Sequence, residues 1–533
     1  MSKTKASYRP AQTTEPLRES TVGSTLREAA AAAPQAIGLV ARSATTAEFL
    51  RWSFTDVLDE AARAARALLG PFEPGERVAV WAPNVAESYF LQLGAALAGL
   101  TLVPVPLALR QRDLGHLLRQ SGAVALFLVP EFRGVPMTAI LDDVRPGLPS
   151  LRETVMLTEW TGFLASGNRR EPLPPVDPRA PAQILYTSGS TGLPKGAVLH
   201  HLGITNSARF VAGRMGVGPG DVWLNFMPLS YVAGSAIATM AALSAGATQV
   251  LCDFEPSLAL SLIQSERCSA LIAGATMYHM LLQSPALAST DMSSLRTVAA
   301  GGSTIPAELA GRVEQVTGAR MTVIYGLTEA CGIALSTRFD DDPADRTATI
   351  GTALPHVGVK VAAPEPGDAL AVGGQGELCL RGYQVMDGYL DLPEATAAAI
   401  DSGGWLHTGD LAIMDERGYV RITGRLKEII NRGGRKIAPG EIEALLQSHP
   451  AISMAAVVGV PDERWGEEIA AFVKLLPGAS AGEEELAGWC RAHLAPYKTP
   501  RHWAFVDELP LTSAGKVRKF MLREWFARER AGS

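Results

Sequence analysis

The sequence has few cysteines, and they show no pairing pattern. Its five cysteines are scattered over 533 residues, and no two of them form a C-x-x-C motif. Disulfide scaffolds and cysteine-based zinc sites both need paired or closely spaced thiols. We therefore expect reduced thiols, no zinc site and a cytoplasmic location.

Charge of one sign and long apolar runs are also scarce. The formal net charge of −6 gives no basic face of the kind that nucleic acids require. The N-terminal residues MSKTKASYRPAQTTEPLRES lack the apolar core of a secretory signal. The most apolar run, residues 91–109, contains Gln92, Pro104 and Pro106, which favours a helix end followed by a strand. We expect no nucleic-acid partner and no membrane span.

Apolar residues in an alternating pattern are plentiful. They make up 47% of the chain, enough for a large core and about two to four domains. Up to about residue 330, short Val/Ile/Leu-rich runs such as 77–83, 183–187 and 322–326 alternate with helical stretches such as 55–69. Apolar strands between helices are typical of α/β sheets that are covered on both faces.

The pattern changes twice further along the chain. Glycine-rich turns and alternating residues from about 345 to 425 predict a smaller antiparallel β region. From about residue 428, the order helix, strand, strand, helix, strand predicts a compact α+β unit of about 105 residues. The predicted fold class is α/β, with a large N-terminal domain of stacked α/β sheets plus a β subdomain, and a small mobile α+β C-terminal domain.

The stretch YTSGSTGLPKG, residues 186–196, is rich in groups that bind phosphate. It follows an apolar strand; its glycines let backbone N–H groups come close, its hydroxyls add donors, and its lysine adds a charge. Its order differs from the Walker loop, in which Gly-Lys-Ser/Thr leads directly into a helix. On this stretch alone, a plain surface turn is the alternative. The candidate phosphate ligands are Thr187, Ser188, Gly189, Ser190, Thr191 and Lys195.

This stretch resembles the signature of the acyl-adenylate-forming (ANL) superfamily, which includes acyl-CoA synthetases, luciferases and the adenylation domains of peptide synthetases. Three further segments resemble that family's motifs in order: VIYGLTEACG (323–332), GWLHTGDLAIMDERGYVRITGRLKEIINRGGRKIAPGEIE (404–443) and LPLTSAGKVRK (509–519). The resemblance covers nearly the whole chain and indicates the acyl-CoA synthetase type.

The resemblance assigns residues to ATP. Tyr325 can stack on adenine, Thr328 can donate to the α-phosphate, and Glu329 is a hard oxygen ligand for Mg²⁺. Asp410 is implied to bind both ribose hydroxyls. For 323–332 alone, a strand end with a capping threonine is the alternative. The remaining implied ATP or AMP contacts are Gly301, Gly302, Ser303, Gly326, Arg425 and Lys516.

The implied reaction has two steps. A carboxylate attacks the α-phosphorus of ATP to give acyl-AMP and pyrophosphate, and a nucleophile then takes the acyl group. Because two anions meet in the first step, the catalytic residues Thr328, Glu329 and Lys516, with Mg²⁺, are expected to neutralise charge and position the groups. A lone surface lysine is usually solvated, but Lys516 stands in the family's lysine loop.

The resemblance also implies a domain rotation between the two steps. The expected domains are 1–424, with the acid and ATP sites, and 429–533, with the catalytic lysine. Residues 425–428 are the expected hinge, with Lys427 at the turning point. Gly433 and Gly434 are expected to give the pantetheine arm of CoA close backbone access, although a simple β-turn also explains the pair.

The segment after Val222 bears on the acid. No Asp or Glu occurs between Val222 and Cys252, so this stretch offers no partner for the ammonium group of an amino acid. We therefore expect an uncharged acyl or aryl acid. The expected acid-pocket residues are Tyr231, Val232, Gly234, Met277, Tyr278, Cys331 and Gly332.

Two features of the sequence bear on the nucleophile that accepts the acyl group, and they point to different acceptors. The sequence ends 17 residues after Lys516 with no carrier domain, so we expect a free-standing ligase that uses ATP, Mg²⁺ and CoA. However, Ser230-Tyr231 stands where the family often has an aromatic-His pair. The alternative is an adenylating enzyme that passes its acyl-AMP to a carrier-protein thiol, an amine or another small nucleophile. A more remote one is a non-catalytic nucleotide-binding paralogue, which would be expected to lose Lys516 or Glu329.

Overall fold

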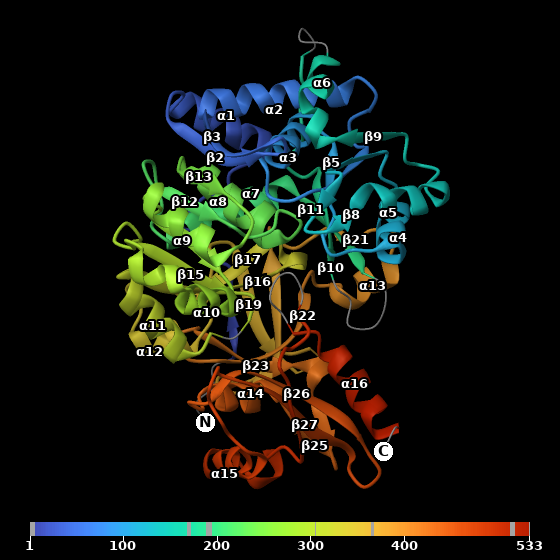
Figure 1. The fold of residues 1–533 in the computed structure, drawn as a ribbon. Helices are drawn as coiled ribbons and strands as arrows, with labels where there is room; N and C mark the ends of the chain where they lie inside the picture. Colours follow the sequence, from blue (N-terminus) through green and yellow to red (C-terminus); the bar gives the residue numbers. More distant parts are fainter. Residues whose placement is uncertain are drawn as a thin grey trace.

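The computed structural model describes residues 6–167, 172–187, 194–303, 305–363, 367–511 and 517–531. The structure contains two large sheets, a smaller antiparallel sheet and a C-terminal unit with a sheet of its own (Figure 1). This arrangement confirms the predicted α/β class. Within the described ranges, none of the helices combines the length and the apolar character that a membrane-spanning segment needs.

A seven-stranded sheet contains the two strands that flank the glycine-rich stretch at 186–196. Its central strands are parallel, and β11 and β21 add an antiparallel edge. In spatial order the strands are β21 (Gly388–Tyr389), β11 (Lys195–His200), β10 (Pro181–Thr187), β5 (Thr101–Pro104), β4 (Arg77–Trp81), β6 (Ala125–Leu128) and β9 (Glu153–Met156).

A nine-stranded sheet carries the motif at 323–332. Its six inner strands are parallel, and antiparallel strands close both edges. In spatial order the strands are β18 (Thr352–Ala353), β17 (Gly332–Ser336), β16 (Arg320–Leu327), β15 (Thr297–Gly301), β14 (Ala270–Ala273), β12 (Val222–Asn225), β13 (Thr248–Leu251), β2 (Ile37–Ser43) and β3 (Thr46–Ser53).

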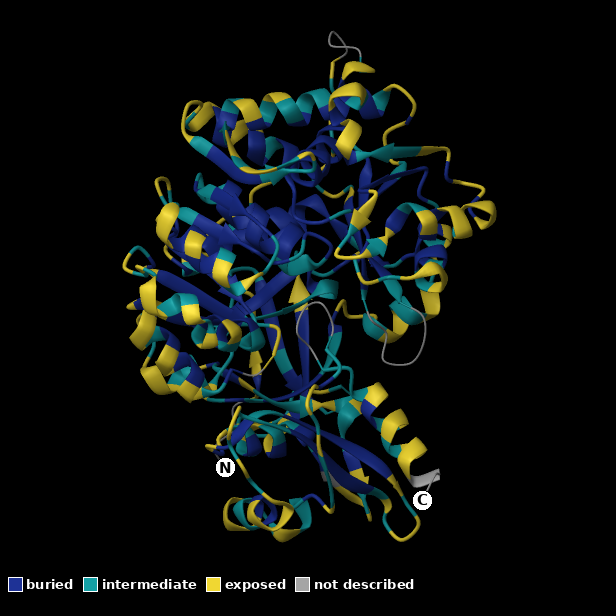
Figure 2. Ribbon diagram, in the orientation of Figure 1, coloured by how far each residue is buried: buried dark blue, intermediate teal, exposed yellow. Residues whose placement is uncertain are grey.

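Buried helices fill the centre of the large domain. Every residue of α3 (Ala86–Ala98) is buried, as are 11 of the 14 residues of α7 (His201–Arg214). The outer helices instead carry exposed residues on one side, as Figure 2 shows. They include α1 (Val22–Ala32), α2 (Phe54–Leu69), α4 (Gln111–Ser121), α5 (Met137–Val144), α9 (Pro256–Ser265), α10 (Ala275–Gln283), α11 (Ala307–Thr317), α12 (Pro343–Ala348) and α13 (Pro393–Ala399). Helix α8 (Thr239–Ala245) has no exposed residue and belongs with the buried helices.

A five-stranded antiparallel sheet corresponds to the β region that the sequence predicts. Its order is β1 (Tyr8–Arg9), β19 (Val357–Ala362), β20 (Gln375–Gly382), β22 (Leu406–Met414) and β23 (Val420–Arg425). The edge strand β1 comes from the N-terminal segment, which the sequence patterns do not place.

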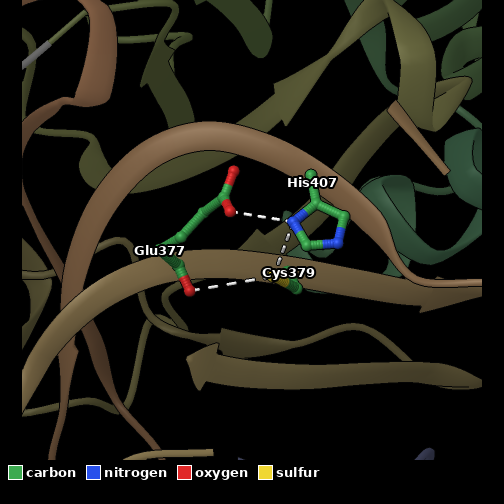
Figure 3. A group of neighbouring side chains, drawn as sticks. All are labelled: Glu377, Cys379 and His407. Carbon is green, nitrogen blue, oxygen red and sulfur yellow. Dashed lines mark hydrogen bonds and ion pairs between the residues drawn. The ribbon is translucent and has the colours of Figure 1, made fainter. Parts of the chain in front are cut away.

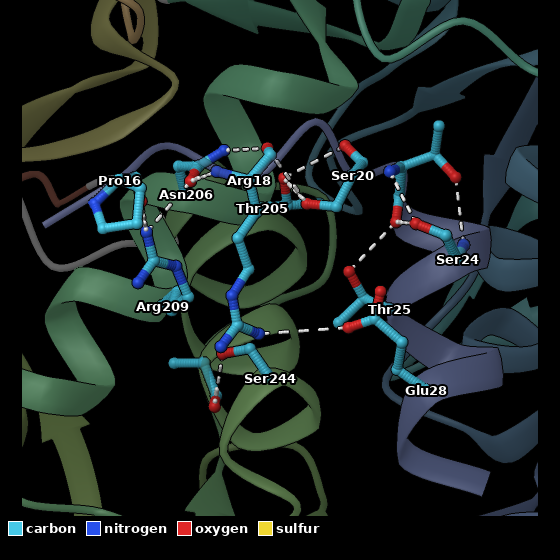
Figure 4. Close-up of polar contacts among 12 residues, drawn as sticks. Pro16, Arg18, Ser20, Ser24, Thr25, Glu28, Thr205, Asn206, Arg209 and Ser244 are labelled. Carbon is cyan, nitrogen blue, oxygen red and sulfur yellow. Dashed lines mark hydrogen bonds and ion pairs between the residues drawn. The ribbon is translucent and has the colours of Figure 1, made fainter. Parts of the chain in front are cut away.

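The N-terminal segment continues from β1 along α7 (Figure 4). The backbone N–H of Arg18 donates to Asn206 Oδ1, and Asn206 Nδ2 donates to the carbonyl of Arg18, both at 2.9 Å. The Ser20 hydroxyl donates to Thr205 Oγ1 at 3.0 Å. These side chains of α7 thus fix the segment that leads from the small sheet to α1.

The C-terminal unit contains the predicted helix–strand–strand–helix–strand series, preceded by a short hairpin and followed by a helix. Apolar side chains on both faces of its sheet are buried. The elements are β24 (Ile430–Arg432), β25 (Arg435–Ile437), α14 (Pro439–Gln447), β26 (Ile452–Asp462), β27 (Gly466–Leu475), α15 (Glu483–His493), β28 (His502–Phe505) and α16 (Lys519–Ala531).

Candidate active site

Tyr389 contacts residues of the first two motifs, 186–196 and 323–332. Thr187, at the end of β10, lies opposite Lys195, at the start of β11, and the Thr187 hydroxyl donates to the carbonyl of Lys195 at 3.5 Å. The ammonium nitrogen of Lys195 lies 5.1 Å from the centre of the Tyr389 ring. The Tyr389 hydroxyl in turn donates to Glu329 Oε1 at 2.7 Å. One tyrosine therefore joins the strands that flank the phosphate stretch to Glu329. Ser188, Gly189, Ser190 and Thr191 lie outside the described residues.

Glu329 lies in a short 3-10 turn, Thr328–Ala330, directly after β16. Its backbone carbonyl accepts from the N–H of Met386 at 2.9 Å. Burial raises the pKa of Tyr389 and the Glu329 charge raises it further, so the phenol stays protonated and donates. No sequence motif marks Tyr389, which lies between two motifs and has no chemical pattern of its own.

The glycine-rich end of β15 lies beside the same motif. Gly301 pairs with Ile324 in the parallel ladder, next to Tyr325, and Gly302 and Ser303 follow it. Gly326 is required sterically, because a Cβ there would lie 1.8 Å from the carbonyl oxygen of Gly332. The structure therefore brings the residues that were predicted at 301–303 and at 325–329 together.

Asp410 lies in the third motif, residues 404–443, and connects it to the second motif, residues 323–332. It is buried, with 5% of its surface exposed. Its Oδ2 accepts from the Tyr325 hydroxyl at 2.6 Å, and its Oδ1 pairs with Arg425 Nε at 2.8 Å. Asp410 and Arg425 also face each other in the β22–β23 ladder. Burial raises the pKa of Tyr325, and the Asp410 charge raises it further, so the Tyr325 hydroxyl remains a donor.

Glu377 holds the turn that leads to Asp410 (Figure 3). One of its carboxylate oxygens contacts His407 Nδ1 at 2.8 Å, and the other accepts from the N–H of Gly409 at 3.0 Å. The Thr408 hydroxyl donates to the carbonyl of Leu378 at 2.7 Å. The three residues before Asp410 are therefore all tied to β20. The one sequence signal of this support is an acidic residue inside the otherwise apolar strand GELCL.

The side chains of Glu377, Cys379 and His407 lie within 4.8 Å of one another, a spacing that metal ligands also have. Both oxygens of Glu377 already accept hydrogen bonds. Burial raises the pKa of Cys379 to about 12, so in this structure its thiol is protonated. The group is best explained as a hydrogen-bonded support for the Asp410 turn.

The predicted acid-pocket residues fall into two sets. Tyr231 and Val232 are half-buried and directly precede a π-helix, Ala233–Ala238, an irregular turn that is frequent at functional sites. Gly234 lies inside it, so close to Pro228 that a Cβ would lie 2.3 Å from the Pro228 carbonyl oxygen. This turn is tied to the seven-stranded sheet, because the Ser235 hydroxyl donates to Gln183 Oε1 at 3.0 Å.

Cys331 and Gly332 face this turn and α7. A Cβ at Gly332 would lie 2.9 Å from Ile237 Cγ1, and one at Gly203 would lie 2.7 Å from the sulfur of Cys331. The second set, Met277 and Tyr278, lies on α10 in a buried apolar cluster. The Tyr278 hydroxyl donates to the carbonyl of Ala299 at 2.9 Å, so its polar end is bound to the sheet.

The predicted hinge and CoA residues lie in the next segment. Lys427 is exposed in a 3-10 turn, Leu426–Glu428, that joins β23 to β24. Gly433 and Gly434 form the turn between β24 and β25, with φ values of 57° and 81°. Gly433 packs on Trp465, where a Cβ would lie 2.5 Å from a ring carbon, whereas the side of Gly434 is open. Lys516, the predicted catalytic lysine, lies outside the described residues.

Family models match most of the chain. The model of the AMP-binding enzyme matches residues 26–390, and that of the AMP-binding enzyme C-terminal domain matches residues 441–516. A relative from Mycobacterium tuberculosis is 36% identical over 498 residues, which cover 90% of this chain and 95% of that protein. It is named as the CoA ligase of a propanoyl group that carries a methyl-dioxo-octahydroindenyl ring system.

Two solved structures extend the comparison. The anthranilate CoA ligase AuaEII in complex with anthranoyl-AMP has a TM-score of 0.87 and 25% identity, covering 96% of this chain and 98% of that one. The amide bond synthetase McbA from Marinactinospora thermotolerans has a TM-score of 0.82 and 28% identity, covering 95% of this chain and 99% of that one. The chain therefore belongs to the AMP-binding enzyme family, in the acyl-adenylate-forming superfamily that its motifs predict.

Proposed function

We propose that this AMP-forming acid–thiol ligase adenylates an uncharged acyl or aryl carboxylic acid with ATP and passes the acyl group to CoA. The observation that carries the proposal is the connection of Lys195, Tyr389 and Glu329 at the meeting point of the two nucleotide motifs. The M. tuberculosis relative and the anthranilate ligase are both named as CoA ligases, which supports CoA as the acceptor.

In the first step, a carboxylate oxygen bonds to the α-phosphorus as the bond from that phosphorus to the pyrophosphate oxygen breaks. We assign the β- and γ-phosphates to Lys195 and the hydroxyl-rich residues 187–191, and the α-phosphate to Thr328. Lys516 is assigned to the meeting carboxylate and α-phosphate, where negative charge concentrates. A preorganised set of cations and donors lowers this barrier without needing a covalent enzyme intermediate.

Glu329 is the residue that we propose for Mg²⁺. It is half-buried beside the Lys195–Tyr389 pair, and the Tyr389 hydrogen bond fixes one of its oxygens, so the carboxylate is oriented in advance. An oriented carboxylate suits a hard cation, which would neutralise phosphate charge when bound.

We assign the ribose to Asp410 and adenine stacking to Tyr325. The carboxylate of Asp410 is held between Tyr325 and Arg425, and Glu377 fixes the turn that presents it. Ribose hydroxyls are donors, so an oriented carboxylate can accept from both of them. The adenosine half of the site thus depends on one buried, well-supported side chain.

For the second step we propose rotation about 425–428 with Lys427 as the turning point. The Gly433–Gly434 turn is the proposed surface for the pantetheine arm, because one face of Gly434 is open. We further propose a cytoplasmic enzyme, since all five cysteines are buried and free. An amine acceptor is the second candidate, because a structural neighbour is an amide bond synthetase and Ser230-Tyr231 replaces the common aromatic-His pair.

Glu377→Gln is expected to raise the Michaelis constant for ATP about 10- to 100-fold, because the amide can no longer accept from both His407 and Gly409 and the Asp410 turn loosens. Measuring pyrophosphate release at varied ATP concentration gives this Michaelis constant. Glu153→Gln, an exposed change on β9, is the control. An unchanged constant for ATP would show that the Asp410 turn does not need this support.

With a panel of carboxylic acids, the best substrate should consume CoA in a one-to-one ratio with pyrophosphate and give a thioester. The assay compares pyrophosphate release and free thiol with and without CoA. If acyl-AMP accumulates and CoA is not consumed, the acceptor is a different nucleophile. Amines would then be the first replacements to test.

Tyr231→Ala is expected to change the order of preference among the acids, because Tyr231 precedes the π-helix that we place beside the acid. The Michaelis constant for ATP should stay within about threefold, since Tyr231 is not among the residues that we assign to the nucleotide. Measuring kcat/KM for each acid and for ATP separates the effects. Equal losses for every acid and for ATP would make Tyr231 a structural residue.

Lys516→Ala should reduce acyl-AMP formation about 10²- to 10³-fold, the usual loss for one transition-state charge contact. Supplied with synthetic acyl-AMP and CoA, the same variant should form thioester at nearly the wild-type rate. Lys427→Pro should show the converse, because a fixed φ at the hinge hinders rotation but not the first step. Equal losses of both half-reactions in both variants would contradict the rotation.

A further inference from the structure

Lys519, the first residue of α16, forms an ion cluster with two glutamates. Its ammonium nitrogen contacts Glu428 Oε2 directly and lies 2.9 Å from Glu443 Oε1. Glu443 Oε1 also accepts from the N–H of Val457 at 2.7 Å. The Lys519 and Glu443 side chains are only 16% and 18% exposed, so water screens this cluster poorly.

The cluster connects three parts of the C-terminal region. Glu428 is the last residue of the proposed hinge, Glu443 lies on α14, and Lys519 follows Lys516 by three positions in the sequence. Burial alone would lower the pKa of Lys519, but the two carboxylates raise it overall, so the lysine stays charged. Removing one partner of a buried ion cluster leaves uncompensated charge, which makes such a contact hard to separate.

The residues on both sides of Lys516 are held together directly before Lys519. Leu511 and Val517 form an antiparallel bridge, and the N–H of Arg518 donates to the carbonyl of Pro510 at 2.7 Å. Lys519 follows directly. The end of the hinge is therefore connected, through one side chain, to the base of the segment that contains Lys516.

The Gly433–Gly434 turn, in contrast, has anchors of its own. Strand β24 pairs with β27, and Arg432 Nε pairs with the fully buried Glu468. The Gly433 N–H donates to the carbonyl of Trp465 at 2.8 Å. This turn does not need Lys519 to keep its shape.

We infer that Lys519 is a positioning residue for the adenylation step, which fixes the base of the Lys516 segment to the end of the hinge so that both move as one rigid body. The inference rests on the proposed two-step function. It predicts different effects on the two half-reactions. The loss of Lys519 disturbs the segment of Lys516, which we assign to adenylation, and leaves in place the Gly433–Gly434 turn, which we assign to CoA.

The test compares Lys519→Met with Lys474→Met, a lysine of the same domain that pairs with Glu508 at 2.7 Å, away from the hinge. Lys519→Met should lower the rate of acyl-AMP formation about 10- to 100-fold, as expected for a displaced catalytic group. Thioester formation from synthetic acyl-AMP should stay within about twofold of the wild type. Lys519→Arg should restore most of the adenylation rate, and Glu428→Gln should reproduce part of the loss.

Hydrogen exchange provides a readout that needs no acid substrate. The amides of residues 426–430 and 517–518 should exchange faster in Lys519→Met than in Lys474→Met. Equal exchange in the two variants, equal adenylation rates, or an equal loss of both half-reactions in Lys519→Met would each overturn the inference. A wild-type protein that releases no pyrophosphate with any acid would instead overturn the proposed function, while the exchange experiment would still decide the role of Lys519.

Discussion

The buried carboxylate of Asp410 is the contact on which the rest of the site depends. One of its oxygens binds the hydroxyl of Tyr325, which comes from the nine-stranded sheet, and the other binds Arg425, the last residue of β23 before the hinge turn. A buried, charged acceptor with two bound donors is costly to leave unpaired. The 323–332 motif, the small antiparallel sheet and the start of the proposed hinge are therefore held in one fixed relation.

Around this carboxylate, the proposed rotation separates the part of the protein that must stay rigid from the part that must move. Tyr389 and Glu377 lie on the side of the large domain, where they orient Glu329 and Asp410 through neutral or charge-assisted hydrogen bonds. Beyond the 3-10 turn Leu426–Glu428, the chain forms a second body with its own sheet and core. Under the proposed rotation, substrate contacts on the first body stay preorganised while the second body presents different surfaces to them.

The features of this protein that depend on residues close together in the sequence can be predicted from the sequence alone. The α/β class, the strands at 183–187 and 322–326 and the residue order of the C-terminal unit follow from periodicity and turn residues, and the motifs identify Lys195, Glu329 and Asp410. Tyr389, Glu377 and Lys519 could not be selected in the same way, because their importance comes from partners 60, 30 and 91 positions away. The burial of Tyr278 likewise depends on its packing against β15, which the spacing of its neighbours does not reveal.

Strand β1 has a consequence for how the protein is made. Ser7 finds its partner, the carbonyl of Ala371, 364 positions later in the chain. At typical translation rates, the N-terminal segment must wait on the order of a minute before the edge that it completes has been synthesised. The small sheet therefore cannot be completed until that edge has been made, so the segment around β1 finds its native place late.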